Sequence, residues 1–113
     1  MLKFLKNLEL AGITFIRSYI QFLFDGPVLN TYTLPKIKIK NKEFTLAQYG
    51  YYDALCSLIG KRVLSAYEDK SENRLVIQFE NDMELVISLR TEDRQCAEAA
   101  MIQGEQKGKW KIW

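Results

Sequence analysis

The sequence predicts an α+β fold, in which a twisted antiparallel sheet is built from two meander-like halves with two short helices on one face. Strand-length runs of alternating apolar and polar residues occur in both halves of the chain. Each half also opens on a short amphipathic stretch that precedes a glycine. The 113 residues include only two prolines and no linker-like segment, so we expect a single domain over residues 1–113.

The two predicted helices are both short. Leucine recurs at every third position over residues 2–8 among polar residues, which favours a helix closed by Gly12. Residues 54–59 repeat this pattern before Gly60, and Asp53 is a suitable N-cap. We expect both helices to pack on the same face of the sheet.

Strands are predicted from residue 63 onwards and around residue 40. Apolar residues alternate with polar ones on both sides of Asn81-Asp82, a tight-turn pair, so residues 75–89 read as a hairpin. Residues 36–46 form another, with lysines at alternate positions that we interpret as the protection of an edge strand.

The C-terminal segment is less uniform. Residues 99–103 and 109–113 flank a loop between two glycines and predict a third hairpin. Residues 92–101 are equally compatible with a helix, because alanine and glutamate favour one, and with a strand.

An internal similarity relates the two halves. Residues 10–15 (LAGITF) resemble residues 58–63 (LIGKRV), and each copy is followed by a strand that ends in an aromatic, an acidic and a small residue. This predicts a pseudo-repeat over residues 2–33 and 51–90, with chance similarity as the alternative.

Histidine is absent, which excludes Ser–His–Asp and Cys–His nucleophile systems and His-ligated metals. Cys56 and Cys96 form no CxxC pair, so we expect two free, reduced, buried thiols and neither a metal site nor a cofactor. The most apolar stretch is interrupted by Arg17, Gln21 and Asp25, which argues against a membrane span. We therefore expect a soluble cytoplasmic protein that is not an enzyme.

Charge is unevenly distributed along the chain. Residues 1–64 hold nine Lys/Arg and four Asp/Glu, whereas residues 65–105 hold four Lys/Arg and ten Asp/Glu. A net charge of +2 does not suggest a nucleic-acid partner, but a bipolar surface can steer a charged protein. In a meander, the loops near Asp69 and Glu92 would share one end of the sheet and the turn at Asp82 would lie at the other.

The candidate partner-binding residues are acidic and aromatic. The acidic candidates could bind a basic protein, or they could form an ordinary solvated face. Two tyrosines before the second helix could contribute contact area to an interface, or could pack the entry to that helix. The candidates are Glu68, Asp69, Glu72, Glu80, Asp82, Glu84, Glu92, Asp93, Tyr51 and Tyr52.

Three segments carry a family resemblance. Residues 55–63 (LCSLIGKRV) lead into residues 75–87 (LVIQFENDMELVI), and the chain ends in the tryptophan-containing residues 110–113 (WKIW). Over residues 50–113, with a fainter echo at 8–29, the chain resembles small bacterial immunity proteins of contact-dependent growth inhibition and other polymorphic toxin systems.

The resemblance implies a cytosolic protein that binds one cognate toxin domain, often a nuclease, and blocks it. It transfers no binding residue, because its motifs are mostly structural. The alternative function is a non-catalytic structural or adaptor module that acts through self-association. Neither alternative involves nucleic acid or a membrane as the partner.

Overall fold

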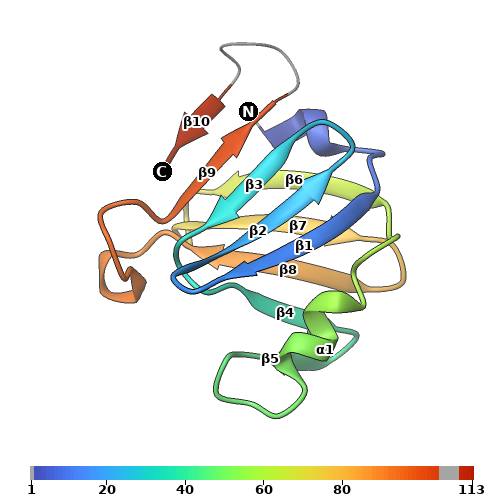
Figure 1. Cartoon of the computed structure of the whole chain (residues 1–113), viewed down its shortest axis with the longest axis horizontal. Coiled ribbons are helices and arrows are strands. Elements are labelled where there is room, and N and C mark those ends of the chain that lie inside the picture. The colour runs from blue at the N-terminus through green and yellow to red at the C-terminus, as the bar shows by residue number, and fades with distance from the viewer. Residues whose placement is uncertain (1, 105–109) are drawn as a thin grey trace.

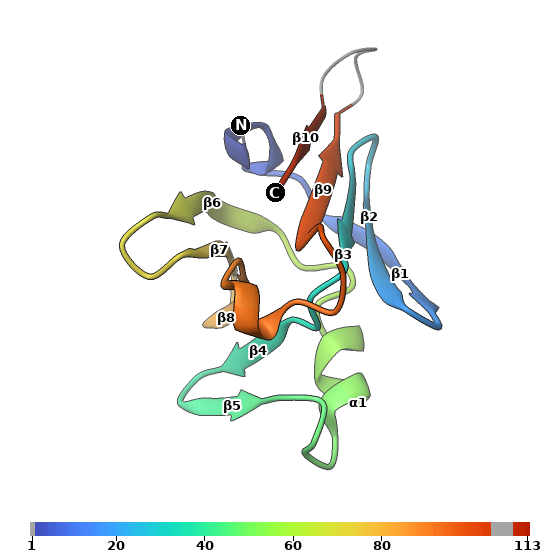
Figure 2. The same ribbon diagram turned by 90° about the vertical axis from the view of Figure 1, so that its left-hand side faces the viewer.

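The computed structural model describes residues 2–104 and 110–113, which form two five-stranded antiparallel sheets around a shared core (Figure 2). Sheet 1 has the order β1-β2-β3-β9-β10, with strands at Leu10–Ile16, Tyr19–Phe24, Val28–Thr31, Ala100–Gln103 and Trp110–Ile112. Sheet 2 has the order β5-β4-β8-β7-β6, with strands at Lys42–Phe44, Lys36–Ile39, Met83–Ser88, Arg74–Phe79 and Val63–Asp69. The strands of the two sheets run in different directions (Figure 1).

The predicted antiparallel meanders are confirmed, but an α+β class with two helices is only roughly compatible with this structure. Helix is limited to α1 (Tyr51–Cys56) and two 3-10 turns, η1 (Leu2–Leu5) and η2 (Thr91–Asp93). The strands form two sheets rather than one because the chain crosses from β3 to β4 and returns from β8 to β9.

The predicted helix ends are partly wrong. At the N-terminus the chain turns at Asn7, which has a left-handed φ of 73°, and Gly12 lies inside β1 rather than at a helix end. Helix α1 begins after Gly50, whose φ is 87°, and Asp53 lies in the first turn instead of capping it. In the first turn the negative charge of its carboxylate still interacts favourably with the helix dipole. Gly60 does take the predicted left-handed conformation, with a φ of 86°.

The predicted hairpins over residues 75–89 and 36–46 are both present. β7 and β8 pair with Phe79 opposite Met83, so residues 80–82 form a short three-residue turn in which Asn81 and Asp82 have left-handed φ angles of 66° and 58°. β4 and β5 also pair as predicted.

The C-terminal hairpin of β9 and β10 is confirmed, although most of its connecting loop lies outside the described residues. Residues 92–101 are neither the predicted helix nor a full strand, because only the one-turn η2 and the start of β9 fall within them. The Arg94 guanidinium donates to the carbonyls of Leu89 (2.8 and 3.1 Å) and Ala97 (2.7 Å). These bonds hold the segment as an irregular loop.

The two predicted repeats each contain a one-turn helix followed by three antiparallel strands. The segments first aligned differ in structure, since residues 10–15 lie in β1 and residues 58–63 link α1 to β6. They instead contact each other: the Gly60 amide donates to the Leu10 carbonyl at 2.8 Å, and the Leu10 amide donates to Lys61 at 3.1 Å. This contact ties β1 of sheet 1 to the segment that leads into β6 of sheet 2. The repeat itself stays a prediction.

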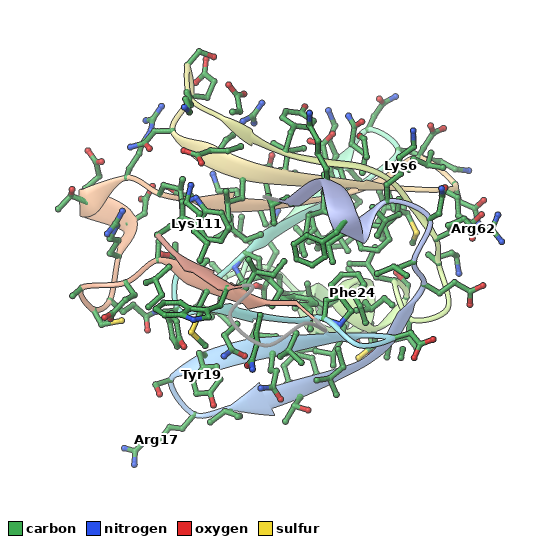
Figure 3. The ribbon with its side chains drawn as sticks, turned by 90° about the horizontal axis from the view of Figure 1, so that it is seen from above. Lys6, Arg17, Tyr19, Phe24, Arg62 and Lys111 are labelled. Atoms are coloured by element: carbon green, nitrogen blue, oxygen red, sulfur yellow. The ribbon has the colours of Figure 1, made fainter. Side chains whose placement is uncertain are left out.

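The core fills the space between the sheets. Phe22 and Leu29 come from sheet 1, and Ile77 and Leu85 come from sheet 2, all fully buried. Figure 3 shows Phe24 among these side chains, whereas Arg17 extends away from the tip of the β1–β2 hairpin. The core is therefore common to both sheets.

The cysteines differ from expectation in their burial. Cys56 and Cys96 are free, as predicted, but both are exposed. Cys56 lies at the end of α1 and Cys96 in the irregular loop before β9. The prediction of buried thiols is wrong because both residues lie on polypeptide that packs only one side against the core.

Candidate functional site: a charged hollow on sheet 2

The outer face of sheet 2 is built by strict alternation. Ile37, Ile77 and Leu85 point into the core, so their neighbours in β4, β7 and β8 point outward. The strand register then aligns outward residues in rows. One row crosses all five strands and consists of Glu43, Lys38, Glu84, Gln78 and Ser65.

This face is hollowed where η2 and the β6–β7 turn rise beside it. The hollow has a volume of about 580 Å³. We call it the charged hollow, because its lining includes four basic and four acidic side chains: Lys36, Lys38, Arg74, Arg90, Glu43, Glu72, Glu84 and Asp93. A second hollow of about 620 Å³ continues from it and shares Lys38 and Glu84.

Some of these charges have partners within the protein. Arg90 pairs with Glu72 at 3.5 Å, and the Ser88 hydroxyl donates to Asp93 at 2.6 Å. Glu84 accepts a hydrogen bond of 3.3 Å from the Gln78 amide.

Three other charges in the charged hollow are free to meet a ligand. Across residues 2–104 and 110–113, the side chains of Lys36, Lys38 and Glu43 make no hydrogen bond or ion pair. Lys38 nevertheless lies between Glu43 and Glu84 in its row. The charges in this row therefore alternate in sign across the strands, and those of Lys38 and Glu43 are free.

The predicted acidic residues divide between the two ends of sheet 2, as the meander geometry requires. At one end the Leu89 amide donates to the Asn73 carbonyl at 2.9 Å, which brings the β6–β7 turn beside the end of β8. Glu92 is exposed in η2 at this end. Asp82 lies at the opposite end, where its carbonyl accepts from the Lys40 amide at 2.8 Å. The structure thus does not gather all the acidic candidates into one cluster.

Glu68 has a structural contact that sequence reasoning missed. Its carboxylate accepts a 3.0 Å hydrogen bond from the Trp113 indole and lies 3.5 Å from the Lys111 ammonium. The indole bond is the main cause that lowers the pKa of Glu68, and Lys111 adds to it. Glu68 therefore joins β6 to the end of the chain beyond β10.

Asp69 is also satisfied within the protein. The Ser71 hydroxyl donates to it at 2.7 Å, and the Arg74 guanidinium donates to it at 3.1 Å. These bonds, that of Ser71 first, lower the pKa of Asp69. Much of its charge is already compensated before any partner arrives.

Three remaining candidates lie away from the charged hollow. Glu80 accepts a 3.0 Å bond from the Arg62 amide. Tyr51 is 1% exposed, and its hydroxyl donates to the Pro35 carbonyl at 2.5 Å. Burial raises its pKa, and it offers no surface to a partner in this conformation. Tyr52 is half exposed, and its ring packs edge-on against Phe15 at 5.2 Å between centroids.

The basic part of the charged hollow was interpreted differently from the sequence. Lys36 and Lys38 were expected to protect an edge strand, but β4 lies between β5 and β8 and is not an edge. The alternation with Ile37 does place both lysines on one outward face. The pairing of β4 with β8, which the local sequence does not reveal, turns that face into the floor of the charged hollow.

The described residues include no group of three or more His, Cys, Asp or Glu side chains arranged to hold a metal ion. Among the same residues, no helix combines the length and apolar character needed to cross a membrane.

Comparisons of the chain with protein-family models, with curated proteins and with solved structures return no significant match.

Proposed function

We propose that this protein is a cytoplasmic immunity protein that binds and neutralises a cognate toxin domain by stoichiometric protein–protein inhibition. The sequence resemblance described above supports this function, and no catalytic step is part of it. On this proposal the toxin binds the outer face of sheet 2 and uses the charged hollow as the centre of the contact. The toxin's activity, whether a nuclease or another, stays open.

The observation that carries the proposal is the alternation of charge across the strands of the charged hollow. Lys38 lies between Glu43 and Glu84 in the strand register, and Lys36 and Lys38 have no internal partner among the described residues. A partner with the complementary pattern gains several opposite-charge contacts at once. A partner with a different pattern meets like charges, which is costly. A mixed pattern therefore favours discrimination between cognate and non-cognate toxins.

The acidic residues of β6 are less suited to this role. Glu68 and Asp69 already accept hydrogen bonds from Trp113, Ser71 and Arg74. A toxin would have to displace these donors before it could use the carboxylates. The proposal keeps Glu72, Glu84 and Asp93 of the original candidates in the interface because they line the charged hollow.

The test is capture of the partner followed by charge reversal. The tagged protein is purified from its native cells at low and high salt, and any polypeptide recovered in equal proportion is expressed alone. We expect that polypeptide to be toxic, and co-expression of this protein to restore growth. The double variant Lys38→Glu/Glu84→Lys should lose at least tenfold in affinity, because it inverts the central charges of the row.

Asp25→Lys provides the matched control, since Asp25 is exposed in the β2–β3 turn of the other sheet. It should leave toxin binding unchanged. Recovery of this protein alone from cells that make the toxin would overturn the proposed function. Equal affinity of the double variant and the native chain would remove the charged hollow from the interface.

A further inference from the structure

The outer face of sheet 1 carries no charge over the strands that the structure describes. Phe22, Leu29 and Ile102 of β2, β3 and β9 are fully buried, so the residues that alternate with them face outward. In the described strands of this sheet, every outward side chain is apolar or uncharged. We call these outward positions the uncharged face. Its exposed members include Ile16 and Ile112, at 39% and 44% exposure.

One row of this face has a large side chain at one end and a glycine, which has no side chain, at the other. The register aligns Gly12, Leu23, Val28, Gln103 and Trp110 across the five strands. The tryptophan at the β10 end is 55% exposed. At the β1 end the glycine leaves the surface without a side chain.

Gly12 adjoins a β-bulge, because the register of β1 with β2 shifts between Leu10 and Gly12. Gly12 does not have a left-handed φ, and an added Cβ would meet only Leu23 Cδ1, at an ordinary contact distance of 3.8 Å. Glycine inside a strand weakens the strand and often marks a bulge, as here, or a place where a ligand or another backbone approaches closely. The uncharged face therefore has an exposed indole ring at Trp110 and a position without a side chain at Gly12.

We propose that a second copy of this chain packs its uncharged face against the first around a two-fold axis that runs parallel to β3. Such an axis reverses the order of the strands and keeps each row opposite itself. Trp110 of each copy then lies over Gly12 of the other copy, and Val28 lies opposite its own counterpart. Stacked sheets pack about 10 Å apart, so an indole ring fits best where the opposing residue is small.

The second row agrees with the same axis. It consists of Thr14, Gln21, Asn30, Met101 and Ile112. The Gln21 amide donates to the Asn30 carbonyl oxygen at 3.0 Å, so these polar groups are paired within one copy. The axis places Asn30 opposite its counterpart and Ile112 opposite Thr14, without opposing any two charges.

Charge and size both favour a second copy as the occupant. A partner for this face must itself be uncharged over the same width, and this chain carries such a surface. The five strands contain seven, six, four, four and three residues. At about 4.8 Å between strands and about 3.4 Å per residue they cover about 400 Å² in projection. This size indicates a weak dimer that forms as the protein concentration rises.

The inference does not rest on the proposed toxin-binding function, because the two surfaces belong to different sheets. Sedimentation equilibrium of the full chain, from micromolar to millimolar concentration, should show a monomer–dimer equilibrium. Trp110→Ala and Gly12→Leu should each weaken the dimer on the order of tenfold or more, the first by removing the ring and the second by filling the gap. Lys38→Ala on the other face should leave the dimer constant unchanged.

Folding of the variants is checked by circular dichroism, and a second measurement uses the native Trp110. In a Trp113→Phe background, emission comes from Trp110 alone and should shift to shorter wavelength as the dimer forms. A chain that stays monomeric at millimolar concentration would overturn the inference. So would a dimer that retains its affinity in both variants. Capture of the toxin by Trp110→Ala should persist, which separates this result from that of the proposed function.

Discussion

The outer face of sheet 2 carries eight charged side chains around one hollow, whereas the described outward residues of sheet 1 carry none. The burial of apolar side chains does not follow this difference in charge. Val76, on the outer side of β7, is completely buried between its cross-strand partners Tyr67 and Val86, while Trp110 on the uncharged face is more than half exposed. The charged face thus has a packed apolar floor, and the uncharged face offers its apolar groups to solvent. Polarity and availability for contact are separate properties of a sheet face.

The largest expected difference between the faces is in how much a valine-to-alanine substitution lowers the free energy of unfolding. Val76→Ala removes fully buried methyl groups and should lower the free energy of unfolding by about 2 kcal/mol. Val28→Ala, at a partly buried position of the uncharged face, should lower it by only about 0.5 kcal/mol. Urea denaturation of both variants measures the contrast. Equal losses would show that the floor of the charged face is not packed as described.

The second difference is in the response to salt. Toxin binding at the charged hollow should become about tenfold slower between low and high ionic strength, because screening weakens the steering by charges. Self-association through the uncharged face should change by less than about twofold over the same range. Stopped-flow association and sedimentation equilibrium compare the two. A strongly salt-dependent dimer constant would indicate that the dimer forms through charged side chains and not through the uncharged face.

A smaller effect concerns the link between the sheets at Glu68. Because the pKa of Glu68 is lowered in the folded protein, its ionised form stabilises the fold above the pKa of the unfolded chain. That contribution is lost as the pH falls through the folded-state pKa. Glu68→Gln should therefore be less stable than the native chain at neutral pH, by up to about 1 kcal/mol.

This difference should disappear in acid, so urea denaturation is repeated as the pH is lowered. Glu98→Gln, at an exposed position in the loop before β9, is the matched control and should show no such trend. A Glu68→Gln deficit that does not change with pH would indicate that packing, rather than the charge, is lost.

The smallest effect is expected from the two thiols. Cys56 and Cys96 are exposed and lie in α1 and the loop before β9, outside both rows of the uncharged face. A thiol reagent should modify both in the native protein. The dimer constant should then change by less than about twofold, since neither residue contributes to the opposing faces. Thiols that react only after denaturation would contradict the described exposure.

The sequence predicted what depends on neighbours along the chain. Alternation and the Asn81-Asp82 pair located the β7–β8 hairpin, because side-chain period and turn conformation are local properties. The division into two sheets was not predicted, since it depends on the pairing of β3 with β9. Gly12 was assigned to a helix end because a glycine after an amphipathic stretch usually terminates one.

The candidate site was predicted only in outline. The separation of Asp82 from Asp69 follows from the meander and is found in the structure. The charged hollow depends on Lys36 and Lys38 of a strand that pairs with β8, far away in the sequence. The indole bond to Glu68 joins residues 45 positions apart. Local patterns do not contain such contacts.

The pairing of β3 with β9 also has a consequence for synthesis of the chain on the ribosome. β1, β2 and β3 emerge early, but β9 follows about 70 residues after β3. Until then the nascent meander presents an unpaired strand at β3, and unpaired edges of this kind promote aggregation. Contacts between distant residues also slow folding. We therefore expect sheet 1 to form last, although its first three strands are made first.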